Sequence, residues 1–221
     1  MNLLVFYGGT FDPVHEGHLS IARAAHVALR ETIALVPAAD PPHRPSPGAS
    51  APQRADMLDL AVAGEPGLCV DRRELARDAA SYTIDTLHDL RLQHGREQPI
   101  AWLLGADSFR GLPEWKRWRE LLDCCHFVVA DRAGSPLDDR LAPGLADALR
   151  GRWTHRPDDL KESPAGRVLR LEQPLHPASA TAIRRAIARG LSWREDVPPA
   201  VADYIQRHRL YRDGSTPDPS L

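Results

Sequence analysis

The chain has 221 residues, of which 43% are hydrophobic and 26% charged, a composition typical of a soluble globular protein of about one ordinary domain. Its formal net charge of −2 gives no electrostatic reason for a polyanionic partner, so we expect no nucleic acid to bind. Lys116 and Lys161 are the only lysines among the 28 basic residues, which leaves arginine, histidine and backbone N–H groups for any phosphate chemistry.

Residues 3–36 carry the pattern of a β-α-β unit. An unbroken apolar run at 3–7 predicts a strand that is buried on both faces of a sheet. Apolar residues at helical spacing over 18–30 predict a helix, and 32–36 predicts the second strand. The first run is far too short for a membrane span or a signal-peptide core, so we expect a cytoplasmic protein with no membrane partner.

The alternation of strands and helices continues along the chain. Further strands are predicted at 68–70, 100–104, 127–130 and 167–171, and further helices at 52–62, 82–93 with Ser81 as cap, 113–122, 179–189 and 201–207. The segment 37–52 holds six prolines and predicts a long extended loop of the kind that is commonly functional. This order predicts an α/β fold, a Rossmann-like doubly wound parallel sheet with a small C-terminal helical region. We expect a single domain over 1–212 and a disordered tail at 213–221.

The segment between the first strand and the first helix carries the clearest chemical signal. It reads Gly8-Gly9-Thr10-Phe11-Asp12-Pro13-Val14-His15-Glu16-Gly17-His18. A helix that begins just beyond a parallel strand offers free N–H groups to an anion, and paired glycines let the backbone approach a phosphate. His15 and His18 lie on one side of the entering helical turn and can donate to phosphate oxygens. The segment lacks both G-x-G-x-x-G and the lysine of a P-loop, which argues against hydride transfer and P-loop kinase chemistry.

Two other interpretations of the histidine pair stay open at this point. A structural turn with two surface histidines would show the same residues. A zinc site would need a third ligand that the sequence does not reveal, and the spacing differs from the pair in H-E-x-x-H. Cys69, Cys124 and Cys125 form neither a disulfide framework nor a spaced metal pair, so we expect reduced thiols and no metal held by the protein itself.

A second helix start near the other end of the chain has related features. Ser179-Ala180-Thr181-Ala182-Ile183-Arg184 places hydroxyl groups at the beginning of a helix and an arginine one turn further on, which together suit a phosphate. Taken alone, the same residues also fit an N-cap serine on a surface helix with a solvated arginine. The co-occurrence with the first loop favours the phosphate clamp.

Both motifs resemble the signatures of the nucleotidyltransferase superfamily, and the first is highly specific. Within that superfamily, segments spread over the chain are similar to those of the bacterial nicotinate-nucleotide adenylyltransferases. These segments are Pro41-Pro42-His43-Arg44, Ser81-Tyr82-Thr83, Trp102 to Phe109, Leu112 to Trp115 and Val197 to Tyr211. The likeness runs from Gly8 to Tyr211 and is weakest over 134–167. It departs at Ala180, where many members have a second serine, and at Arg44, where many have lysine.

The resemblance implies a specific reaction. The phosphate of nicotinate mononucleotide attacks the α-phosphorus of ATP in line, giving deamido-NAD and pyrophosphate in NAD biosynthesis, with Mg²⁺ bound through the ATP phosphates. The nucleophile is already ionised, so the protein supplies positioning and charge stabilisation rather than a general base.

The resemblance also implies roles for named residues. His15, His18 and Arg184 are the expected catalytic groups, the histidines on the α-phosphate and the arginine on the leaving phosphates. The expected ATP-binding residues are Gly8, Gly9, Thr10, Phe11, Gly105, Asp107, Ser179, Thr181 and Arg184, with Asp107 on the ribose. The expected residues for nicotinate mononucleotide are Asp12, Arg44, Thr83, Trp115 and Lys116, with Trp115 stacked on the pyridine ring.

Alternatives remain for the function and for single residues. The acceptor could be another phosphate such as phosphopantetheine or an alcohol phosphate, or the chain could be a non-catalytic nucleotide-binding module on the same fold. Trp115 could be an aromatic paired with Trp118, and Arg44 a solvated loop charge. The sequence leaves open whether the protein is a monomer or a homodimer.

Overall fold

The strands form one parallel sheet in which their spatial order differs from their order in the sequence. The structure is a computed structural model that describes residues 2–39, 48–77, 80–131 and 141–212. Within these residues seven strands pair in the order β3-β2-β1-β4-β5-β7-β6, each with a parallel neighbour. They are β1 (Leu4–Gly9), β2 (Ile33–Pro37), β3 (Leu68–Val70), β4 (Ile100–Gly105), β5 (His126–Ala130), β6 (Trp153–Thr154) and β7 (Val168–Leu171).

The strand order reverses between β1 and β4. From β1 the sheet extends in one direction through β2 to β3, and from β4 it extends in the other through β5 to β7. Crossovers on the two sides of such a reversal leave toward opposite faces, so a crevice opens outside the carboxyl ends of the two central strands. The crevice is therefore expected just beyond Gly9 and Gly105.

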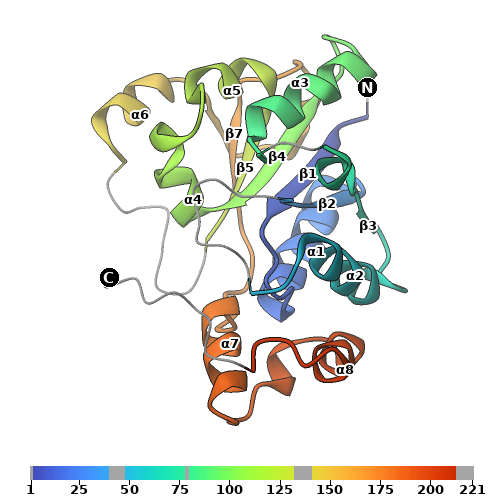
Figure 1. The fold of residues 1–221 in the computed structure, drawn as a ribbon. Coiled ribbons are helices and arrows are strands. Elements are labelled where there is room, and N and C mark those ends of the chain that lie inside the picture. The colour runs from blue at the N-terminus through green and yellow to red at the C-terminus, as the bar shows by residue number, and fades with distance from the viewer. Residues whose placement is uncertain (1, 40–47, 78–79, 132–140, 213–221) are drawn as a thin grey trace.

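Helices cover both faces of the sheet, which gives the Rossmann-like doubly wound fold that the sequence predicts (Figure 1). The α-helices are α1 (Glu16–Leu29), α2 (Ala51–Val62), α3 (Thr83–His94), α4 (Ala106–Arg110), α5 (Trp118–Cys124), α6 (Pro143–Ala148), α7 (Ala180–Ala188) and α8 (Pro199–Arg207). Successive strand side chains alternate between the faces. Thus Val5 and Tyr7 join the hydrophobic cluster of α1, α2 and α8, whereas Phe6 and Trp102 join the cluster of α3, α4 and α5.

The C-terminal helices are continuous with the core on one face. Ile183 of α7 and Val201 and Ile205 of α8 are buried in the same cluster as the apolar side of α1. Figure 1 shows α7 and α8, in orange and red, together at the end of the molecule away from α3 and α5. The predicted serine cap is present, because the Ser179 hydroxyl accepts from the N–H of Ala182 at 3.2 Å.

The predicted helix at 113–122 is wrong as a single element. A 3-10 turn over Leu112–Glu114 is followed by a break, and α5 begins only at Trp118. Arg117 takes the left-handed conformation with φ 53°, which an α-helix cannot contain. The break carries Trp115 and Lys116 toward the carboxyl ends of the strands instead of into a helix.

Several short elements were not predicted from the sequence. They are the helices α4 and α6, the two-residue strand β6, and the 3-10 turns Arg73–Ala76, Pro157–Lys161 and Arg194–Asp196. Such short elements carry too few residues for a periodic pattern, and β6 exists through its pairing with β7. Tertiary contacts rather than local sequence therefore define them.

Cys69, Cys124 and Cys125 are all free thiols, as predicted. Over the described ranges, no helix combines the length and apolar character that a membrane crossing requires.

A buried histidine begins β5 at the amino end of the sheet. His126 is 0% exposed, its Nδ1 accepts from the N–H of Arg167 at 3.0 Å, and its Nε2 lies 2.8 Å from the carbonyl oxygen of Ser163. A neutral imidazole satisfies both contacts, with the proton on Nε2. Burial lowers the pKa of His126, and the positive charges of Arg91 and Arg167 lower it further. The folded protein therefore holds this side chain neutral.

The midpoint temperature of unfolding should fall as the pH drops, and His126 should account for part of the fall. The folded pKa lies below the unfolded value of about 6.5, so its stabilising contribution is complete above about pH 6.5 and declines below it. We expect the midpoint temperature of unfolding to fall less between about pH 8 and about pH 5.5 in His126→Gln than in the wild type. Thermal unfolding at both pH values measures it, and equal losses in the two proteins would refute the assignment.

Candidate functional site

A cleft of about 230 Å³ opens at the carboxyl ends of β1 and β4, where the strand order reverses. Its lining comes from the first loop, the strand ends, the start of α3 and the break before α5. The lining residues are Gly8, Gly9, Thr10, Val36, Ala38, Glu74, Ser81, Tyr82, Thr83, Ile84, Trp102, Leu104, Ser108, Gly111, Glu114, Trp115 and Lys116. Six of the residues expected from the sequence, Gly8, Gly9, Thr10, Thr83, Trp115 and Lys116, thus meet in one cleft.

The loop after β1 is shaped by close packing as much as by glycine freedom. A Cβ on Gly8 would collide with the indole of Trp102 on the neighbouring strand, so glycine is required for the two strands to approach. Phe11 is 2% exposed and has φ 51°, and its ring meets that of Tyr7 edge-on with centroids 5.5 Å apart. The expected ATP-binding residue Phe11 therefore anchors the loop to the core.

The two histidines lie against each other beside a second, smaller hollow. The rings of His15 and His18 have centroids 3.7 Å apart, and His15 is the N-cap residue of α1. This hollow is lined by His15, Gly17, His18, Ile21, Asp131, Gln173, Pro174, His176 and Ala178. A Cβ on Gly17 would lie 3.0 Å from the His15 ring and 3.1 Å from the carbonyl oxygen of Ala178. Glycine at this position therefore lets the segment before α7 approach the histidine pair.

The second motif reaches the first loop through an arginine. Arg184 donates from Nη1 to the carbonyl oxygen of Asp12 at 2.6 Å and lies 3.7 Å from its Oδ2. Residues 172 positions apart are thereby joined. Ser179 stands at the N-cap of α7 and Thr181 is exposed in its first turn. The start of α7 and the start of α1 thus lie at the same edge of the sheet.

Asp12 is committed to contacts within the protein. It is 5% exposed, and its carboxylate accepts from the N–H of Gly48 at 2.8 Å, from the N–H of Ala49 at 3.1 Å and from the hydroxyl of Tyr211 at 2.7 Å. Burial and the neighbouring carboxylate raise the pKa of Tyr211 well above its usual value, so the phenol stays a donor. These bonds favour a role for Asp12 in organising the loop over the expected contact with the mononucleotide.

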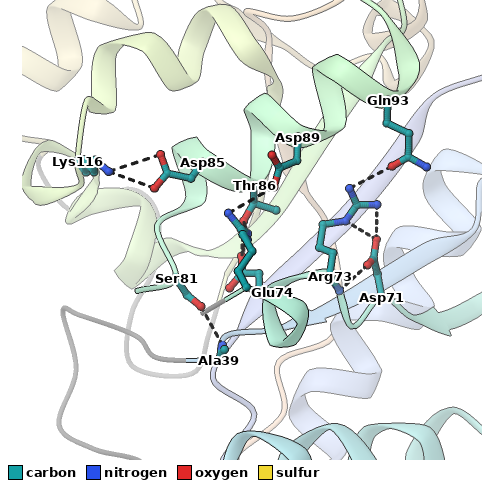
Figure 2. Close-up of polar contacts among 11 residues, drawn as sticks. Ala39, Asp71, Arg73, Glu74, Ser81, Asp85, Thr86, Asp89, Gln93 and Lys116 are labelled. Atoms are coloured by element: carbon teal, nitrogen blue, oxygen red, sulfur yellow. Dashed lines mark hydrogen bonds and ion pairs between the residues drawn. The ribbon is translucent and has the colours of Figure 1, made fainter. Parts of the chain in front are cut away.

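Thr83 and Lys116 both line the cleft, and the Lys116 ammonium lies against the start of α3. Thr83 is the first residue of α3, whose N-cap Tyr82 makes no side-chain cap. The predicted cap by Ser81 is wrong, because the Ser81 hydroxyl instead accepts from the N–H of Ala39 at 2.9 Å, as Figure 2 shows. The start of α3 keeps uncapped N–H groups at the cleft. Lys116 is exposed and its ammonium is 3.1 Å from Asp85 and 4.3 Å from the centre of the Tyr82 ring.

A buried carboxylate forms part of the cleft wall and was not foreseen from the sequence. Glu74 is 5% exposed, and its Oε1 accepts from the hydroxyl of Thr86 at 2.6 Å. Arg77 donates to the same hydroxyl and also pairs with Asp89 at 3.5 Å. This network ties the 3-10 turn Arg73–Ala76 to α3 behind the cleft.

The remaining expected residues lie near the edge or outside the described residues. Gly105 ends β4 and is the N-cap residue of α4, and Asp107 is exposed in the first turn of that helix. Arg44 lies outside the described residues. Sequence reasoning missed Tyr82, Ser108, Asp131, Gln173, His176, Arg54 and Tyr211 near these sites. Tyr82, Ser108 and Tyr211 stand in segments that the resemblance already covers, whereas the others gave no local signal.

The comparisons with known proteins agree on one family. A family model described as cytidylyltransferase-like matches residues 6–186. The probable nicotinate-nucleotide adenylyltransferase of Stenotrophomonas maltophilia is 54% identical over 217 residues, covering 96% of this chain and 98% of that protein. The similarly named protein of Pectobacterium atrosepticum is 44% identical over 215 residues, covering 96% of this chain and 99% of that protein.

Solved structures share the fold at low sequence identity. Plasmodium falciparum nicotinic acid mononucleotide adenylyltransferase complexed with NaAD matches with a TM-score of 0.73 at 15% identity, covering 96% of this chain and 98% of that one. The solved structures support the fold alone, whereas the sequence identity to the bacterial relatives over nearly the whole chain supports the family. The chain therefore belongs to the nicotinate-nucleotide adenylyltransferase family of cytidylyltransferase-like proteins.

Proposed function

We propose that this protein transfers the AMP part of ATP to nicotinate mononucleotide, giving deamido-NAD and pyrophosphate in NAD biosynthesis. The observation that carries the proposal is the hollow that the paired imidazoles share with the segment leading into α7, together with the cleft lined by Trp115 and the start of α3. The bacterial relatives bear this activity in their names, and one structural neighbour is described as complexed with NaAD. The cytoplasm, where both substrates occur, is the proposed location.

In this proposal the ATP phosphates bind beside the smaller hollow of the histidine pair, and the acceptor binds in the larger cleft. His15 and His18 donate to the α-phosphate as charge develops on its oxygens, with the N–H groups of Gly9 and Thr10 nearby. Arg184 and the start of α7 hold the leaving phosphates, because a guanidinium pairs well with phosphate oxygens. The acceptor phosphate comes from the larger cleft and attacks in line. No general base is required, since that phosphate is ionised at neutral pH.

Mg²⁺ would be held by the phosphates of ATP in this proposal, and it would supply charge neutralisation there. The phosphate loop, Gly8 to His15, contains one carboxylate, that of Asp12, whose oxygens already accept from Gly48, Ala49 and Tyr211. Mg²⁺ commonly keeps water and substrate phosphate oxygens as ligands rather than an all-protein cage. The residues present therefore suit a metal delivered with its nucleotide, where it neutralises the charge of the leaving group.

The uncapped start of α3 at the cleft favours a pyridine that carries a carboxylate over one that carries an amide. An uncapped helix start presents N–H donors and the positive end of the helix dipole, both of which suit a carboxylate. An amide would turn its own NH₂ toward one of these donors and leave a polar group unpaired. The charge of Lys116 contributes less than its position suggests, because Asp85 already partners it.

Nicotinate mononucleotide should be preferred over its amide by at least about tenfold in kcat/KM, which is roughly 1.4 kcal/mol. Steady-state kinetics with both mononucleotides at saturating MgATP measure the ratio. Equal specificity constants, or a preference for the amide, would contradict acid selectivity while leaving adenylyl transfer in place.

The acceptor class is tested by a panel. Pyrophosphate release from MgATP is followed with nicotinate mononucleotide, nicotinamide mononucleotide, phosphopantetheine, an alcohol phosphate and no acceptor. We expect turnover to depend on a pyridine mononucleotide. Faster release with another phosphate would assign a different acceptor, and ATP binding without release in every reaction would assign a non-catalytic module.

A further inference from the structure

One arginine is wholly buried beside the phosphate loop yet lines neither hollow. Arg54 of α2 is 0% exposed, and it donates to three backbone carbonyl oxygens rather than to a carboxylate. Its Nη1 reaches Thr10 at 2.6 Å, its Nη2 reaches Ala39 at 3.0 Å, and its Nε reaches Ala49 at 3.2 Å. A buried charge is costly unless its donors are satisfied, and here the three bonds join three separate segments.

The buried carboxylate of Asp12 binds peptide N–H groups in one of the segments that Arg54 also holds. The carboxylate of Asp12 accepts from the N–H of Gly48 and of Ala49, and Tyr211 donates its hydroxyl to it. The peptide groups of Ala49 are therefore held at the N–H by Asp12 and at the carbonyl by Arg54.

Ala39 is held in the same way at both of its polar groups. Its carbonyl accepts from Arg54, and its N–H donates to the Ser81 hydroxyl that stands before α3 (Figure 2). The chain just beyond β1 and β2 and just before α2 is thereby cross-linked by charged side chains.

We propose that Arg54, Asp12 and Tyr211 form a loop anchor that positions the Thr10–Asp12 segment, and with it Arg184, for adenylyl transfer. Arg54 holds the carbonyl oxygen of Thr10, a residue that lines the cleft. Asp12 receives Arg184 at its carbonyl oxygen, so a shift of the segment moves the arginine as well. The anchor residues are positioning residues in this scheme, and the inference rests on the proposed adenylyl transfer.

The chain offers a matched control at the opposite edge of the sheet. Arg91 of α3 is half-buried and also donates to backbone carbonyls, at Cys124 with 2.7 Å and at Pro164 with 2.8 Å. These carbonyls precede β5 and β7, at the amino ends of the strands. Arg54→Lys and Arg91→Lys each keep the positive charge but cannot make several bonds at fixed angles. Both should lower the unfolding temperature, and a purely structural role predicts equal activity per folded molecule.

The test compares kcat and KM for the two variants at a temperature where circular dichroism shows each to be folded. We expect Arg54→Lys to lower kcat by about 10-fold to 100-fold, with KM for nicotinate mononucleotide within about threefold of wild type. Arg91→Lys should keep kcat within about twofold. Wild-type kcat in folded Arg54→Lys, or an equal loss in Arg91→Lys, would overturn the proposal. An inactive wild type would instead refute the proposed function.

A milder pair of variants decides the question if Arg54→Lys does not fold. Tyr211→Phe removes only the hydroxyl that donates to Asp12, whereas Tyr204→Phe removes a hydroxyl that donates to Asp56 on the far side of α2 at 3.2 Å. We expect kcat to fall about 3-fold to 10-fold in the first and to stay unchanged in the second. Unchanged kcat in Tyr211→Phe would overturn the loop anchor.

Discussion

Replacing His18 with alanine should lower kcat by about 10²–10³-fold, or about 2.7–4 kcal/mol, while leaving the fold intact. The imidazole lies beside that of His15 at the start of α1. In the proposed reaction it donates to the charge that develops on the α-phosphate. A preorganised donor of this kind acts mainly in the transition state, so KM for either substrate should change little. Steady-state kinetics and circular dichroism of His18→Ala measure both quantities.

His94→Ala is the matched control for this variant. His94 is exposed at the last position of α3, away from both hollows. Its replacement should leave kcat as in the wild type. A folded His18→Ala protein with near-normal kcat would show that the imidazole does not act on the α-phosphate.

Replacing Arg184 with alanine should lower kcat/KM for MgATP by roughly 10-fold to 150-fold, the effect of losing about 1.5–3 kcal/mol of charge-assisted bonding. KM for nicotinate mononucleotide should change by less than about threefold, because the proposed partners of the arginine are the leaving phosphates. The exposed neighbour Arg185 on the same helix supplies the control, and Arg185→Ala should resemble the wild type. Equal losses for both substrates would count against the assignment.

The central strands and the first motif could be predicted because their causes are local. Strands β1, β4 and β5 are buried on both faces and so appear as unbroken apolar runs. Helix α7 begins at a serine that caps it and ends before Gly190. The closeness of His15 and His18 follows from their spacing at a helix start.

The loop anchor could not be predicted because its contacts are distant in sequence. Tyr211 donates to a carboxylate 199 positions earlier, and Arg54 reaches a carbonyl 44 positions earlier. No local pattern tells a buried arginine on α2 from the exposed arginines of other helices. The break at Arg117 could not be predicted for a different reason. The left-handed residue there is an arginine, whereas glycine and asparagine are the residues that signal this conformation.

The fate of the α-phosphate tests the central claim most directly. The protein is incubated with nicotinate mononucleotide and MgATP radiolabelled on its α-phosphate, and the products are separated and identified. Adenylyl transfer predicts that the label appears in deamido-NAD, with one pyrophosphate released for each label transferred. Label found only in free AMP or ADP, or left in ATP when the protein is folded and both substrates are present, would contradict the account.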